Sequence, residues 1–226
     1  MPRQVKSRQR VVEHGEVFTN EREVNAMLDL VKQETERIDS RFLEPACGNG
    51  NFIAEVLRRK LAVVSARYKK SQLEYMRYAF VAASSIYGVD IMADNVEECR
   101  ERLFNIVHDT ARADIKGAVD PQFLDAARYV IKKNILCADA LTLKDADGKP
   151  IAFAEWSMVT GDLVKRRDYL LSDLLDGNLN KGETLSLFGA AGNAVQWEFD
   201  EETQSFIPSA IREYPPVDYR EVSLNG

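Results

Sequence analysis

Apolar residues between residue 20 and about residue 140 alternate between helical spacing and short continuous runs. In five segments they recur three or four residues apart, as on one face of a helix. These segments cover residues 24–31, 53–64, 73–81, 96–106 and 123–130. Asn20 with Glu23 three residues later is a typical start for the first helix, and Asp120 followed by Pro121 is a typical start for the last. The pattern therefore predicts helices throughout this region.

Short apolar runs lie between these helices. They read RFLEPA (41–46), SIYGVDI (85–91) and NILCADAL (134–141), and each is too short for a helix. Strands separated by helices favour parallel pairing through right-handed crossovers. The expected fold class is α/β, with a Rossmann-like, doubly wound and mostly parallel sheet.

The pattern is weaker after residue 141. IAFAEWSMV (151–159) and AVQWEFD (194–200) predict strands, and VKRRDYLLSDLLDG (164–177) predicts a helix with Gly177 at its C-cap. The expected organisation has a basic N-terminal arm, one domain that carries a helical insert, and an extended tail. Their ranges are residues 1–19, residues 20–200 with the insert at 60–84, and residues 201–226.

Composition narrows the class of protein. The 226 residues are 45% hydrophobic, which supports a sizeable core, and the formal charge of −6 argues against tight non-specific binding to nucleic acid. Two basic stretches, within residues 3–10 and 58–70, are local exceptions, for which a solvated tail or helix face is the simpler interpretation. No apolar run approaches the roughly 20 residues of a membrane span, and no apolar segment follows the basic N-terminus as in a secretory signal. A cytoplasmic protein is expected.

The segment FLEPACGNGNF (42–52) places Gly48 and Gly50 between the first predicted strand and the next helix. Ligands in open parallel sheets lie at this position. A dinucleotide fingerprint would require Gly or Ala at position 53, where this chain has Ile53, and an acid about 20 residues further on. The segment is therefore a poor match to a dinucleotide site. No Lys-Ser or Lys-Thr follows the glycines, so a P-loop is excluded.

Acidic residues end all three predicted strands, at Glu44, Asp90 and Asp139. Carboxylates at successive strand ends can accept hydrogen bonds from ribose hydroxyls and from an adenine amino group, each worth about 1.5–3 kcal/mol. Glycines let an amino-acid arm lie against the backbone. The combination favours S-adenosylmethionine as the cofactor.

These residues resemble a known family. FLEPACGNGNF is similar to motif I of the N6-adenine-specific DNA methyltransferases of restriction-modification systems, which use S-adenosylmethionine. HGEVFTNEREVNAML (14–28) resembles the N-terminal cofactor motif of the family, and YGVDI and CADAL resemble its second and third motifs. The resemblance covers residues 14–141 in the order of the family.

The resemblance assigns ten residues to the cofactor. Those at the amino-acid arm and sulfonium are Phe18, Thr19, Glu44, Ala46, Gly48 and Gly50. Those at the ribose and adenine are Asp90, Ile91, Asp139 and Ala140. For Phe18 a hydrophobic staple before the helix is an equally good interpretation. Cys47, Cys99 and Cys137 are expected to be reduced, and Cys47 to be a small buried thiol rather than a nucleophile.

The catalytic loop of the family, Asn/Asp/Ser-Pro-Pro-aromatic, is absent from the sequence. Pro215 and Pro216 are the only adjacent prolines, and Tyr214 and Val217 flank them. Tyr offers no carbonyl acceptor for the amine protons of the target base, and Val cannot stack on it. No catalytic residue and no metal ligand is therefore assigned, and we expect no activity on DNA by the chain alone.

Three interpretations of this cofactor part stay open: a subunit of a split enzyme, a degenerate copy, or a truncated gene product. In the first, the partner is a complementary methyltransferase subunit, and DNA is bound only in the complex or weakly. A rival class is a methyltransferase for a small molecule or protein, with His14 or Tyr169 as its base. A further rival class is a non-catalytic interaction module.

Overall fold

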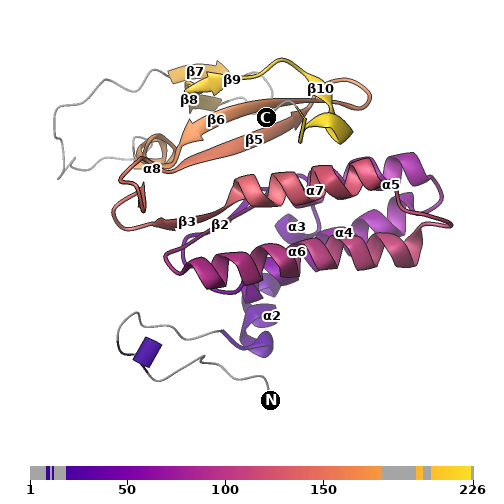
Figure 1. Cartoon of the computed structure of the whole chain (residues 1–226), viewed down its shortest axis with the longest axis horizontal. Coiled ribbons are helices and arrows are strands. Elements are labelled where there is room, and N and C mark those ends of the chain that lie inside the picture. The colour runs from indigo at the N-terminus through magenta and orange to yellow at the C-terminus, as the bar shows by residue number, and fades with distance from the viewer. Residues whose placement is uncertain (1–8, 11, 13–18, 180–196, 201–204, 225–226) are drawn as a thin grey trace.

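The structure is a computed structural model that describes residues 9–10, 12, 19–179, 197–200 and 205–224 (Figure 1). Its helices are α2 (Glu21–Leu30), α3 (Lys32–Thr35), α4 (Asn51–Tyr68), α5 (Gln72–Ser84), α6 (Ala93–Asp114), α7 (Pro121–Asn134), α8 (Leu171–Leu179) and the 3-10 helix η1 (Tyr219–Glu221). Its strands are β1 (Phe42–Glu44), β2 (Ile86–Asp90), β3 (Ile135–Asp139), β4 (Lys144–Asp145), β5 (Ala152–Met158), β6 (Leu163–Leu170), β7 (Trp197–Asp200), β8 (Ser205–Pro208), β9 (Arg212–Glu213) and β10 (Val217–Asp218).

The first sheet has the order β1-β2-β3-β4. β1 pairs parallel with β2, β2 pairs parallel with β3, and the short β4 is antiparallel to β3. Two helices make up each crossover, α4 and α5 between β1 and β2, then α6 and α7 between β2 and β3. The α/β class with a four-stranded, mostly parallel sheet is confirmed.

The local signals that predicted the helices have direct counterparts in the structure. The Asn20 side chain accepts a hydrogen bond from the Glu23 N–H at 3.0 Å, and Asp120 accepts one from Gln122 N–H at 2.9 Å, with Pro121 in the first turn. Of the apolar positions that predicted α5, Met76 and Phe80 are buried, whereas Leu73 in the first turn is 59% exposed. The predicted insert of residues 60–84 is continuous with α4, which runs to residue 68 before α5 begins.

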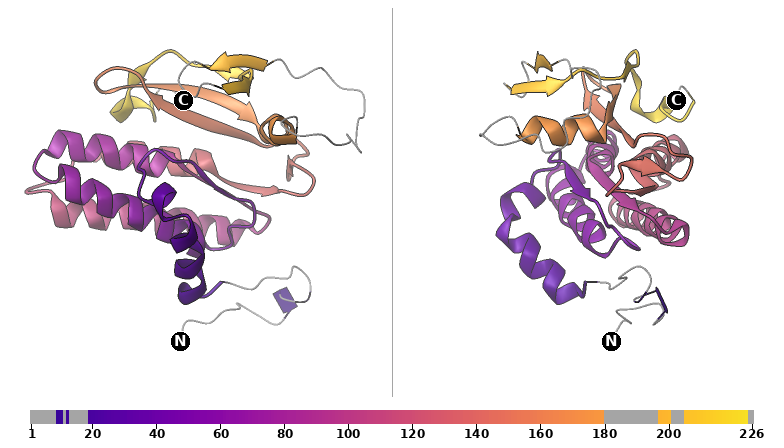
Figure 2. Two further views of the ribbon diagram at one scale, coloured as in Figure 1. Left: turned by 180° about the vertical axis from the view of Figure 1, so that it is seen from behind. Right: turned by 90° about the vertical axis from the view of Figure 1, so that its left-hand side faces the viewer.

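An antiparallel sheet of order β10-β6-β5, with β9 also paired to β6, lies on the far side of α5 and α7 from α4 and α6 (Figures 1 and 2). The strand predicted over residues 151–159 is confirmed as β5. The helix predicted over residues 164–177 is wrong in its first half, because residues 163–170 form β6. α8 continues to residue 179, so Gly177 lies inside it and is not a C-cap. β7 lies within the strand predicted over residues 194–200.

The described part of the C-terminal tail is packed against the domain. β9 and β10 both pair with β6, and Tyr219 at the start of η1 is 1% exposed. Its ring lies 5.2 Å from that of Phe80, measured between centroids, and its N–H donates to the Asp162 carbonyl. This segment is therefore part of the core. None of the helices in the described residues is both long and apolar enough to cross a bilayer.

Candidate functional site

The glycine turn connects the end of β1 to the start of α4. Gly48 and Gly50 have φ values of 53° and 86°, and Gly50 is the N-cap residue of α4. A Cβ atom at Gly50 would lie 2.7 Å from the Sγ of Cys99 on α6. The close approach that excludes a side chain at residue 50 is therefore made by a neighbouring helix. Gly50 is required for packing whether or not a ligand binds.

Asp90, the last residue of β2, links the glycine turn to the start of α6. Its Oδ2 accepts the N–H of Gly48 at 2.9 Å, and its Oδ1 accepts the N–H of Met92 at 2.8 Å. The side-chain amide of Asn95 also donates to Oδ1, at 3.3 Å. The strand-end position of Asp90 thus fixes the backbone of the turn at the carboxyl edge of the sheet.

Glu44 and Asp139 end the strands on either side of β2, and they too accept nearby backbone N–H groups. Glu44 accepts from Ala46 at 3.4 Å, and Asp139 accepts from Leu141 at 2.9 Å and from the Thr142 hydroxyl at 3.0 Å. The Leu141 N–H, followed by the Thr142 hydroxyl, lowers the pKa of Asp139. Among the described residues no group of three or more acidic, His or Cys side chains is placed to hold a metal ion.

Apolar side chains at this edge are open to solvent. Ile91, which follows Asp90, is 57% exposed, and Leu141 near Asp139 is 95% exposed. Ala46 is exposed and Ala140 is half-buried. Carboxylates and apolar side chains thus alternate along one surface, which suits a ligand that carries both polar groups and a flat ring.

The segment that resembles an N-terminal cofactor motif reaches the same place in part. The Asn51 side chain, in the first turn of α4, donates to the carbonyl of Thr19 at 3.2 Å, which places residue 19 beside the glycine turn. Phe18 lies outside the described residues. Sequence reasoning missed Asn49, whose buried side chain donates to Glu98 at 2.8 Å while its Oδ1 has no donor among the described residues. The only signal for Asn49 was its position between the two glycines.

Cys47 is buried behind the turn, as predicted, and its N–H donates to the Val89 carbonyl at 2.9 Å. The adjacent Cys99 thiol, together with burial, raises the pKa of Cys47 far above its ordinary value. A thiol that stays protonated is a poor nucleophile. Cys99 is buried as well, and Cys137 is partly exposed.

The rival catalytic groups lie elsewhere. Tyr214, before the two prolines, donates its N–H to a carbonyl of β6. Tyr219, which follows the two prolines, lies near the Asp120 carboxylate at the start of α7. α7 has 14 residues and is about 20 Å long, so its full length separates this place from the start of β3. Tyr169 lies near Arg41 and Glu155, and burial raises its pKa, so the phenol stays neutral. His14 is outside the described residues.

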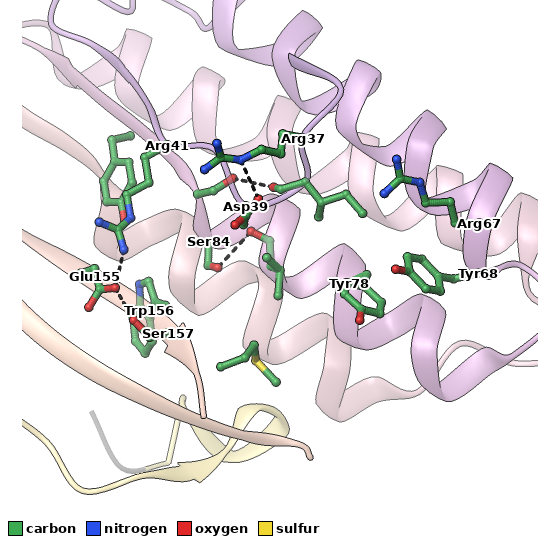
Figure 3. Close-up of a pocket in the computed structure, with 15 residues that line it drawn as sticks. Arg37, Asp39, Arg41, Arg67, Tyr68, Tyr78, Ser84, Glu155, Trp156 and Ser157 are labelled. Atoms are coloured by element: carbon green, nitrogen blue, oxygen red, sulfur yellow. Dashed lines mark hydrogen bonds and ion pairs between the residues drawn. The ribbon is translucent and has the colours of Figure 1, made fainter. Parts of the chain in front are cut away.

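A cavity of about 730 Å³ lies at the opposite edge of the sheet, where β1 and β2 begin (Figure 3). Residues 37–41, 67–68, 78–87 and 155–158 contribute to its walls. No local pattern predicts this cavity, because the segments that form it are far apart in the chain.

No family model matches the chain, and no curated protein and no solved structure matches it either.

Proposed function

We propose that the carboxyl edge of β1, β2 and β3 binds S-adenosylmethionine, and that the sheet is the cofactor part of a Rossmann-like methyltransferase fold. Parallel strands place their carboxyl ends, and hence Glu44, Asp90 and Asp139, along one edge of the sheet. Ligands of open α/β sheets bind in this position. Together with the resemblance of the motifs to adenine-specific DNA methyltransferases, this favours a nucleoside cofactor.

The observation that carries the proposal is the position of Asp90. Its carboxylate holds the glycine turn through Gly48 and the start of α6 through Met92, so its orientation is fixed before any ligand arrives. Each carboxylate oxygen has two lone pairs, and Oδ2 accepts a single hydrogen bond from the described residues. A prealigned acceptor with spare capacity is suited to ribose hydroxyls.

The neighbouring side chains fit the rest of the molecule. Ile91 and Leu141 would cover the faces of the adenine ring, and Asp139 with Ala140 would meet its amino edge. Glu44 would face the cationic arm, with Thr19, Ala46, Gly48 and Gly50 along it and Phe18 as the further candidate. When bound, the cofactor supplies an electrophilic methyl group.

At this edge the described residues contain no Asn/Asp/Ser-Pro-Pro-aromatic segment, which would accept the amine protons of adenine and stack on the base. We therefore propose that the chain alone does not methylate DNA and that a complementary subunit supplies the catalytic loop. The small-molecule methyltransferase gains no support, because Tyr169 lies toward the other edge. Methylation of adenine in duplex DNA by the purified chain would contradict this part of the proposal.

Calorimetric titration with S-adenosylmethionine and with S-adenosylhomocysteine tests the pocket. We expect saturable binding with a stoichiometry near one. Asp139→Ala should weaken it about 10- to 150-fold, the loss of one charged hydrogen bond. Asp120→Ala is the matched control, because Asp120 also accepts a backbone N–H, that of Gln122, at the start of α7, and this helix extends about 20 Å before β3 begins. No heat at millimolar ligand, or equal losses in both variants, would refute the site.

A further inference from the structure

The cavity at the amino edge of the sheet has walls of different chemistry (Figure 3). Arg37, Asp39 and Arg41 come from the segment before β1, Arg67 and Tyr68 from the end of α4, and Tyr78 from α5. Glu155, Trp156, Ser157 and Met158 of β5 form the opposite wall. Its volume of about 730 Å³ is within the range of small-molecule sites.

Tyr68 and Tyr78 form an aromatic platform on one wall. Their rings are stacked, with centroids 3.9 Å apart and planes within 11° of parallel. Both side chains are partly exposed. Figure 3 shows the pair extending from the two helices toward the space that the cavity occupies. Such a pair can continue its stack onto a further flat ring.

Arg67, next to Tyr68, is the cation available to a ligand. Arg41 is paired with Glu155, and Arg37 is paired with Asp39 at 3.2 Å and Glu34 at 3.7 Å. Arg67 makes no hydrogen bond or ion pair with the residues that the structure describes. A guanidinium in this state is well suited to a phosphate.

The wall formed by β5 is the open edge of its sheet. The order β10-β6-β5 leaves β5 paired on one side only. The Val159 N–H donates to the Leu163 carbonyl, so the odd-numbered residues of β5 make the hydrogen bonds to β6. The backbone N–H and C=O groups of the even-numbered residues therefore point away from β6, and the Ala154 carbonyl accepts the Tyr87 hydroxyl at 3.2 Å on that side. The backbone N–H and C=O groups of Trp156 and Met158 therefore point to the open edge. They supply both donors and acceptors beside the cavity.

Two side-chain groups of the same strand add to this. Glu155 is 6% exposed, and its Oε2 has no donor among the described residues. The indole N–H of Trp156 likewise has no acceptor among them. A buried polar atom without a partner is costly, and because both atoms are shielded from solvent, a ligand would pair with them only after these side chains rotate toward the cavity.

We infer that this cavity binds a nucleotide. The base would stack on the platform of Tyr68 and Tyr78, its hydrogen-bonding edge would meet the edge of β5, and its phosphate would meet Arg67. A nucleotide combines a flat ring, mixed donors and acceptors, and one anionic group. An acidic extended peptide could pair with β5 but would leave the aromatic platform without a flat partner. This site lies at the edge opposite to the glycine turn, so the inference does not rest on the proposed cofactor.

Titration of the full chain with AMP, GMP, CMP and UMP tests the inference, with adenosine as the probe that lacks phosphate. We expect saturable binding of at least one nucleotide near a stoichiometry of one, and binding of adenosine at least about tenfold weaker than that of AMP. Arg67→Ala should weaken nucleotide binding about 10- to 150-fold. Tyr68→Leu should weaken it about 5- to 150-fold, whereas Tyr68→Phe should retain it. Arg112→Ala, an equal loss of charge at an exposed position of α6 outside the cavity, should change nothing.

The source of the nucleotide is distinguished by a single-stranded oligonucleotide of about eight residues. Tighter, salt-dependent binding of the strand would indicate a nucleic acid, and equal or weaker binding would indicate a free nucleotide. Asp139→Ala and saturating S-adenosylhomocysteine should leave nucleotide binding unchanged, which separates this site from the cofactor edge. Loss of nucleotide binding in Asp139→Ala, no effect of Arg67→Ala, or no binding of any of these probes would overturn the inference. Binding of an acidic peptide in place of every nucleotide would also overturn it.

Discussion

Replacement of Gly50 by Ala tests why the turn after β1 contains glycine. Two costs follow from the structure. The φ of 86° lies in the left-handed region, which costs a residue with a Cβ about 1–2 kcal/mol. The new Cβ would also lie 2.7 Å from Cys99 Sγ, and Cys99 is fully buried, so the sulfur has little room to move. Overpacking of this kind costs about 1–3 kcal/mol. We expect Gly50→Ala to lower the free energy of unfolding by about 2–5 kcal/mol.

A control and a double variant separate the two costs. Gly148 has a φ of 77° and nothing within 4 Å of its Cβ position, so Gly148→Ala should cost only the conformational part, about 1–2 kcal/mol. Cys99→Ala removes the obstructing sulfur and should itself cost roughly 1 kcal/mol. In that background Gly50→Ala should cost no more than Gly148→Ala.

Urea unfolding followed by circular dichroism supplies the free energies, with unchanged m-values as the sign that the unfolded state is comparable. If the effects of Gly50→Ala and Cys99→Ala add within about 0.5 kcal/mol, the two sites are not coupled. The packing explanation would then be refuted, and the glycine would be explained by backbone conformation or by a ligand.

Further predictions concern the core and a helix cap. Burial lowers the pKa of Lys60 from 10.5 to about 7, with Asp39 opposing the shift, so between these values the unfolded chain binds a proton that the folded chain has released. The stability of the wild type relative to Lys60→Met should therefore rise from pH 7 toward pH 10, by at most about 1.4 kcal/mol per pH unit. If urea unfolding gives a stability difference that does not change with pH, this prediction is contradicted. Tyr219→Ala should destabilise the chain by about 3–5 kcal/mol and expose the C-terminal segment to proteolysis, whereas an unchanged digestion pattern would mean that the segment is not held by the core. Asp120→Ala should cost about 1 kcal/mol through loss of the α7 cap, and a melting temperature equal to that of the wild type would refute the cap.

The sequence was most informative where one segment contains its own signal. The caps at Asn20 and Asp120 and the apolar spacing of α4 to α7 depend on neighbours within a few residues, and the structure has these elements at those positions. The same is true of the three short strands. The prediction of a helix failed for residues 163–170, whose apolar and charged residues fit a helix as well as a strand. Their extended conformation comes from pairing with β5 on one side and with β9 and β10 on the other.

The sequence by itself determined the α/β class, the order of the helices and strands through residue 139, and the acidic residue at each strand end. Parallel pairing then places those residues on one edge, and no side-chain detail is needed for that step. Only the tertiary structure decided that Cys99 occupies the space beside Gly50 and that residue 219 is buried. Only the tertiary structure formed the cavity between residues 37–41, the end of α4, the second half of α5, and β5. These features depend on contacts between segments that are far apart in the chain, and local spacing carries no information about such contacts.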